Sequence, residues 1–304
     1  MMLEVLFLGT GASIPSRRRS PACTVVRAGA DMVMFDCGEG SQRQMMVSPL
    51  SFMKLKGILI THLHGDHIFG LPGLLQTMGL SGRTEPLVLR GPPGFTHAVE
   101  TLLELFEGVR HYTLDIEDVD DGDVIGIGGL RIDCFKTVHG VPSVGFALET
   151  ADRPGQFNRA KAEELGLEIS DYKALRDGKT VKGVSPEDVI GDARPGFRVV
   201  YSGDTVPCDA LRAAARDADL LIHEATYRDS EAELAARYGH TTVGQAARIA
   251  KETGCAHLAL VHVSNRYDDE LDEVEAEARR IFECTEVPED LRMYRLDGNG
   301  FRSV

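Results

Sequence analysis

One short segment restricts the fold of this chain more than any other. Residues 61–67 read T-H-L-H-G-D-H and directly follow the apolar run 57–60. Imidazole nitrogens and carboxylate oxygens both suit Zn²⁺, and a turn beyond a strand lets neighbouring side chains converge. One zinc takes three or four protein ligands, so a cluster of four with alternating direction is better explained by two adjacent metals. The segment therefore predicts a dinuclear metal site at a strand end, with candidate ligands His62, His64, Asp66 and His67.

Further candidate ligands follow other strand-like runs. His139, Asp204 and His262 each come directly after such a run. Alone, a His or Asp at a strand end is usually a capping or hydrogen-bonding group. Together with the first segment, however, these positions place five of the 10 histidines in one expected constellation. We therefore expect them to complete the metal site.

Short apolar runs alternate with helical patterns along the chain. Because strands and helices interleave, layered α/β architecture is expected. The predicted strands cover residues 3–8, 32–35, 57–60, 199–201 and 257–261, and the predicted helices cover 95–107, 210–217, 242–252 with Gly254 as its stop, and 270–284.

The formal charge of −14 argues against a nucleic-acid partner, because affinity for phosphate normally comes from clustered cations. Only 8 of the 33 basic residues are lysines, and the acids are spread over the whole chain, as in proteins of salt-loving organisms. Molar salt shortens the Debye length to roughly 3 Å, which leaves close contacts from a local arginine patch effective. The charge lowers the expectation of RNA binding without removing it.

Cysteine spacing and the N-terminal residues indicate in which compartment the protein is expected. The six cysteines form no C-x-x-C pair, which predicts buried thiols in a reducing cytoplasm. The N-terminus has no basic leader and reaches glycines after one strand's length of apolar residues, so neither secretion nor a membrane span is expected.

Residues 151–196 differ from the rest in being polar, charged and rich in Gly and Pro. Arg153-Pro154-Gly155 and Arg194-Pro195-Gly196 are turn formers at its two ends, and residues 157–166 are compatible with a short helix. The segment is either an ordinary surface loop or a protruding arm, and composition alone does not decide between them.

The H-x-H-x-D-H segment and the later ligand positions resemble metallo-β-lactamase-fold hydrolases from end to end. This resemblance implies one domain over residues 1–304, folded as a four-layer αβ/βα sandwich, with 151–196 as an inserted arm. It implies two Zn²⁺ per chain, other divalent metals being possible. His62, His64 and His139 would hold one ion, Asp66, His67 and His262 the other, and Asp204 would bridge them. Asp66 would also steer the attacking water and accept its proton.

Four further segments resemble ribonuclease Z. Residues 15–20 (P-S-R-R-R-S) are similar to its P-x-K-x-R-N loop, 36–42 to its D-x-G-E-G-T-Q segment, and 223–226 and 239–242 match two others. The resemblance implies removal of the 3′ trailer from precursor tRNA by a homodimer whose arm grips the tRNA. Asp36 would support neighbouring ligands, Glu224 and His240 would pair to protonate the departing oxygen, and Arg17, Arg18 and Arg19 would contact phosphate. The arm departs from the family, since Glu168–Tyr172 replaces its Gly-Pro element.

Two alternatives stay open. A small-molecule phosphodiesterase or arylsulfatase-like hydrolase of the same fold would suit the acidic charge, and the arm and Arg17–Arg19 distinguish it from the nuclease. A catalytically silent binding module is disfavoured because all seven ligand positions are filled.

Overall fold

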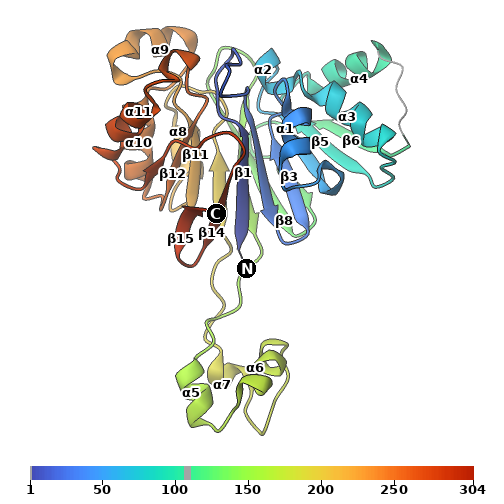
Figure 1. Cartoon of the computed structure of the whole chain (residues 1–304), viewed down its shortest axis with the longest axis vertical. Helices are drawn as coiled ribbons and strands as arrows, with labels where there is room; N and C mark the ends of the chain where they lie inside the picture. Colours follow the sequence, from blue (N-terminus) through green and yellow to red (C-terminus); the bar gives the residue numbers. More distant parts are fainter. Residues whose placement is uncertain (1, 106–110) are drawn as a thin grey trace. The chain divides into compact units, whose positions relative to one another are not determined.

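The computed structural model describes residues 2–105 and 111–304. It divides into two compact units, residues 1–149 with 198–304 and residues 150–197. The first unit contains two sheets, and helices flank each sheet on its outer side (Figure 1). This is the predicted four-layer sandwich.

The first sheet has 8 strands in the order β15 (Gly300–Ser303), β14 (Arg292–Asp297), β1 (Leu3–Gly9), β2 (Cys23–Ala28), β3 (Asp31–Phe35), β4 (Gly57–Leu59), β5 (Leu87–Gly91) and β6 (Leu114–Asp118). The second has 7, in the order β13 (Thr285–Glu286), β12 (Leu258–Val261), β11 (Leu220–Glu224), β10 (Arg198–Tyr201), β9 (Val144–Thr150), β8 (Leu130–Lys136) and β7 (Val124–Ile127). Strands β3 to β6 run parallel to one another, as do β10 to β13. The carboxyl ends of parallel strands meet at one edge of a sheet, which is where ligand sites form in such folds.

Apolar side chains bind the layers together. The helices α1 (Ser41–Val47), α3 (Leu71–Leu80) and α4 (Phe95–Leu105) pack on the first sheet through one buried cluster. The helices α8 (Asp209–Ala214), α10 (Val243–Thr253) and α11 (Leu271–Arg279) pack on the second through another. Between the sheets, the ring of Phe35 lies 5.8 Å from that of Phe146 and 5.2 Å from that of Tyr201. These contacts hold the strand ends of both sheets in fixed positions.

The predicted helices begin near the expected residues, but two end early. Helix α10 begins after the cap Thr242 and ends at Gly254, whose φ of 69° is left-handed, as predicted. Helix α11 ends at Arg279 rather than Cys284, because Ile281 and Phe282 turn inward to pack on the second cluster. Helix α8 ends at Ala214, before the left-handed turn at Asp217. The helix expected over 95–107 is seen to Leu105, and residues 106 and 107 lie outside the described residues.

The second unit has its own small core. It contains α5 (Arg159–Glu164), α6 (Ile169–Arg176) and α7 (Pro186–Val189), packed around Tyr172, Leu175 and Val189. The short helix expected within 157–166 is α5. Helix α6 was not predicted; a capping box between Glu168 and Asp171 begins it, and Tyr172 and Leu175 bury one face.

All six cysteines are free thiols, but the prediction that all are buried is wrong for two of them. Cys208 is half-buried and Cys284 is exposed, because each lies in a connection beside a helix or strand end. No helix in the described part of the chain is long and apolar enough to cross a membrane.

Candidate metal centre

The strand ends of both sheets bring the predicted ligands to one place. His62 follows β4, Asp204 follows β10, and His262 follows β12. Asp66 and His67 stand on the single-turn helix α2 (Gly65–Ile68), which begins directly after His64. A side chain at Gly65 would lie 2.3 Å from the ring of Phe69, so glycine permits this tight turn. His139 comes from the connection between β8 and β9.

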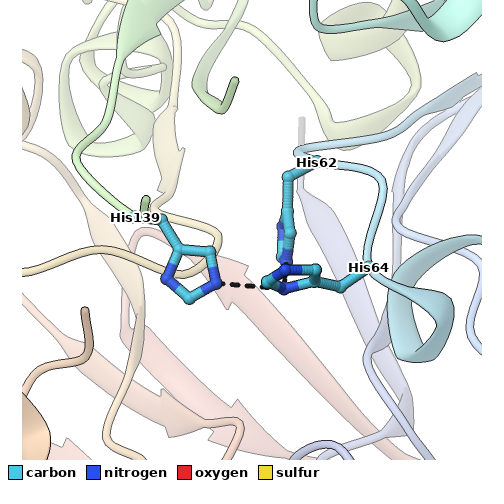
Figure 2. A group of neighbouring side chains, drawn as sticks. All are labelled: His62, His64 and His139. Carbon is cyan, nitrogen blue, oxygen red and sulfur yellow. Dashed lines mark hydrogen bonds between the residues drawn. The ribbon is translucent and has the colours of Figure 1, made fainter. Parts of the chain in front are cut away.

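Five overlapping groups of side chains in the described residues have possible ligand atoms within 4.8 Å of one another, and two of these groups share no residue and match the predicted ligand sets. One is His62, His64 and His139, and the other is Asp66, His67 and His262. Figure 2 shows the first group, with Nε2 of His139 3.2 Å from Nδ1 of His64. Nε2 of His62 lies 3.0 Å from the same Nδ1. Ring nitrogens this close, on rings from three separate positions, can bind one cation when the facing nitrogens carry no proton.

Asp204 lies between the two groups. Its Oδ2 is 3.3 Å from Nε2 of His262, 3.4 Å from Nε2 of His67 and 3.7 Å from Nε2 of His139. Its Oδ1 is buried and has no hydrogen-bond partner in the described chain. An unpaired buried carboxylate oxygen is costly unless a cation compensates it. This oxygen and the nitrogen-rich surroundings fit divalent-cation binding at this place.

The electrostatics favour the ligand protonation states of Asp204, Asp66 and His62. At His67, by contrast, Asp204 and Asp36 outweigh burial and raise the pKa well above its ordinary value, so metal binding there must displace a proton. Burial alone would raise the pKa of Asp204, but His262, His67 and His62 hold it well below its ordinary value. Burial, assisted by His67, lowers the pKa of His62. For Asp66, burial opposes ionisation, yet hydrogen bonds with His262 and His67 lower the pKa. An ionised carboxylate and a neutral imidazole are the ligand forms.

Outer hydrogen bonds orient three of the imidazoles. Nδ1 of His67 donates to Oδ2 of Asp36 at 2.8 Å, Nδ1 of His139 to the carbonyl of Gly239 at 2.8 Å, and Nδ1 of His262 to Oγ1 of Thr226 at 2.8 Å. Each ring then presents Nε2 to the centre, as such outer partners do in metal sites.

The hydrogen bond from His67 to Asp36 agrees with the expectation that Asp36 supports a neighbouring ligand. The contacts made by Gly239, Thr226 and Tyr201 were not predicted from the sequence. The hydroxyl of Tyr201 donates to Oδ2 of Asp36 at 3.0 Å. Thr226 and Gly239 lie in segments quoted for their resemblance, but only the fold shows which histidine each one contacts.

Glu224 and His240 form a pair at the rim of the centre. Nδ1 of His240 donates to Oε1 of Glu224 at 2.9 Å, and that oxygen also accepts the backbone N–H of Thr205 at 2.9 Å. Burial disfavours the charged imidazolium, but Glu224 and Asp204 outweigh it and raise the pKa of His240 to about 9. With Nδ1 bound to Glu224, Nε2 of His240 is the nitrogen left to carry a transferable proton.

Arg17, Arg18 and Arg19 differ in exposure. Arg17 is exposed, and Arg18 has a side chain 67% exposed, paired with Asp269. Arg19 is only 4% exposed, and its guanidinium is bound to Asp268 and to backbone carbonyls. Only Arg17 and Arg18 therefore present cations to the outside.

Comparison with known proteins gives consistent matches. The family model described as "Beta-lactamase superfamily domain" matches residues 32–263. Ribonuclease Z of Methanosarcina acetivorans is 42% identical over 299 residues, covering 95% of this chain and 97% of that protein. Ribonuclease Z of Halobacterium salinarum is 44% identical over 285 residues, covering 91% and 92%. The crystal structure of the short form of human tRNase Z superimposes with a TM-score of 0.68 at 29% identity, covering 95% of this chain and 98% of that one.

Proposed function

The chain belongs to the ribonuclease Z family of the beta-lactamase superfamily, and on that premise we propose that it removes the 3′ trailer from precursor tRNA with two zinc ions. As a member of this family it is a tRNA-processing endoribonuclease that hydrolyses phosphodiester bonds. The proposed products are a 3′-hydroxyl on the tRNA and a 5′-phosphate on the trailer. The observation that carries the proposal is the convergence of two ligand groups on Asp204, with Glu224 and His240 beside them.

The metal ligands are proposed as the two groups described above. His62, His64 and His139 would hold one zinc, Asp66, His67 and His262 the other, and the oxygens of Asp204 would face both. When bound, such ions would lower the pKa of the attacking water and neutralise charge on the phosphate. The free Oδ1 of Asp204 supports this assignment, because it lacks any other partner in the described residues.

The protein's own groups would move two protons. Water attacks phosphorus, and Asp66 accepts the proton that the attacking water loses. The bond from phosphorus to the 3′ oxygen breaks, and Nε2 of His240 gives that oxygen its proton. Glu224 keeps His240 protonated until then and holds the ring in place through Nδ1.

Residues 151–196 are proposed to grip the body of the tRNA. The unit containing them carries Lys161, Lys173, Lys179 and Lys182, half of the chain's 8 lysines. In residues 151–196 the 8 Lys and Arg nearly balance the 9 Asp and Glu, so the net charge of −1 repels a phosphate backbone far less than the −14 of the whole chain would suggest. A homodimer, with the arm of one subunit serving the other, and a cytoplasmic location complete the proposal.

The function is tested with an end-labelled precursor tRNA, at low and at molar salt. Wild type is expected to cut after the discriminator nucleotide. In one variant, the dipeptide Asn-Gly replaces residues 151–196. Because β9 and β10 are antiparallel neighbours, a two-residue turn between Thr150 and Phe197 keeps their register. Cleavage by this variant should fall about 100-fold or more, the loss of roughly 2.7 kcal/mol of binding.

Hydrolysis of bis(p-nitrophenyl) phosphate is the control, because a substrate this small does not need the arm. It should stay within about twofold of wild type when the metal centre is untouched. If wild type leaves precursor tRNA intact yet hydrolyses this ester, the fold is right and the proposed substrate is wrong.

Metal content is predicted separately. Chelator-free protein should contain about two zinc ions per chain by elemental analysis. Because metal binds the native state, its removal should lower the melting temperature by several degrees, and added zinc should restore it. His139→Ala should lose metal, whereas His97→Ala, an exposed histidine on α4, should not. Less than one metal per chain with full activity would contradict the mechanism.

A further inference from the structure

One carboxylate holds both ends of the loop formed by residues 10–20, here called the arginine loop. Oδ1 of Asp290 accepts the backbone N–H of Thr10 at 3.0 Å and its hydroxyl at 2.8 Å. Oδ2 accepts the backbone N–H of Ser20 at 2.6 Å and the side-chain amide of Gln44 at 3.2 Å. Hydrogen bonds to an ionised group are about twice as strong as neutral ones, so Asp290 fixes where the loop leaves and rejoins the sheet.

The tip of the loop is a tight turn built by Ser16. Its Oγ accepts the backbone N–H groups of Arg18 and Arg19, at 3.1 and 3.0 Å, and its own N–H donates to the carbonyl of Arg19 at 2.9 Å. Arg17 stands at this turn, exposed, with no hydrogen-bond or ion-pair partner among the described residues. An unpartnered guanidinium is suited to bind phosphate through two parallel hydrogen bonds.

The loop is also joined to the segment that follows His262. Gly11 and Val263 form a parallel bridge, and the N–H of Ala12 donates to the carbonyl of Val263 at 3.2 Å. Buried Arg19 donates to the carbonyl of Ser264 at 3.0 Å and to Oδ1 of Asp268 at 2.8 Å. The position of Arg17 is thereby tied to that of a proposed metal ligand.

The backbone around Asp290 is itself constrained. Leu291 has a φ of 64°, a left-handed conformation that costs a leucine about 1 to 2 kcal/mol and persists only where surrounding contacts fix it. Its N–H donates to the carbonyl of Phe7 at 2.7 Å, directly beside the start of the arginine loop. This turn brings the Asp290 side chain back onto Thr10 and Ser20.

We propose that Asp290 is a positioning residue that fixes the arginine loop, so that Arg17 holds the phosphate next to the one being cut. The inference rests on the proposed function, because it assumes that RNA lies across the metal centre. Without the carboxylate the ends of the loop separate, and Arg17 no longer sits at one distance from His262. The enzyme then binds precursor tRNA more weakly and cuts at neighbouring phosphates as well.

The test compares Asp290→Asn with wild type on end-labelled precursor tRNA and on bis(p-nitrophenyl) phosphate. One acceptor oxygen becomes a donor, so either Thr10 or Ser20 loses its partner. We expect KM for precursor tRNA to rise about tenfold, with kcat, metal content and hydrolysis of the small ester unchanged. Additional cleavage products one nucleotide away should appear.

A matched control is Asp118→Asn, since Asp118 also accepts two backbone N–H groups, those of Gly94 and Thr96, but belongs to β6. It should leave KM and the cleavage position unchanged. In an Arg17→Ala background, Asp290→Asn should add little, because the two act through one contact. If Asp290→Asn does not fold, Thr10→Val removes one donor to the same carboxylate and takes its place in the test.

Two results would overturn the inference. One is an Asp290→Asn enzyme with the wild-type KM for precursor tRNA and a single cleavage position. The other is equal loss on both substrates, which would mean damage to the metal centre. A wild type that cuts no tRNA would instead reject the proposed function, so the two failures are distinguishable.

Discussion

Asp204→Ala should lower precursor tRNA cleavage by at least about 10³-fold, because metal ions contribute several kcal/mol to such reactions. Asp204 is 3% exposed and lies between the two ligand groups, so its removal affects both proposed zinc ions at once. Elemental analysis of the variant should find metal well below the wild-type content. Asp204→Asn keeps one oxygen without the charge and should retain more metal than the alanine variant.

Melting curves separate this loss from unfolding. In chelator, Asp204→Ala should melt below wild type, because the imidazoles of His262 and His67, which hold the pKa of Asp204 low, lose their anionic partner. The variant should still be folded at the assay temperature, so that its lost cleavage reports lost metal. A variant that keeps two metals and most of its activity would show that Asp204 does not bridge them.

The sequence best predicts those ligands that lie close together along the chain. His62, His64, Asp66 and His67 lie within one short segment, so their type and spacing are enough to indicate metal chemistry. His139, Asp204 and His262 were expected from their places after strand-like runs, whereas the division of the ligands between two ions was implied only by the family resemblance. In the structure, the loops after β4 and β12, which belong to different sheets, bring their histidines to one place.

The parts that sequence analysis missed depend on contacts between distant residues. Asp290 meets Thr10 across 280 positions, and nothing in its own segment distinguishes it from the chain's other acids. Arg19 was grouped with Arg17 and Arg18 because all three are adjacent. The structure separates them, since the turn at Ser16 sends Arg19 inward onto Asp268. In this loop, adjacent arginines have different surroundings because of the turn at Ser16.

His240→Ala should reduce precursor tRNA cleavage by about 10² to 10⁴, the usual contribution of a general acid. Hydrolysis of bis(p-nitrophenyl) phosphate should fall far less, because p-nitrophenolate departs as a stable anion and needs no proton. The ribose 3′ oxygen is a poor leaving group without one. Glu224→Gln keeps an acceptor for Nδ1 of His240 but removes the charge, so it should show the same selectivity with a smaller loss.

Metal content distinguishes a general acid from a metal ligand at His240. His240 lies within 4.8 Å of donor atoms of His139 and Asp204, so it is also placed where a ligand could stand. A general acid can be removed without losing metal, whereas a ligand cannot. If His240→Ala contains wild-type metal and spares the activated ester, His240 is the proton donor. If it loses metal and both activities fall together, His240 is a ligand, and the 3′ oxygen must receive its proton from another group.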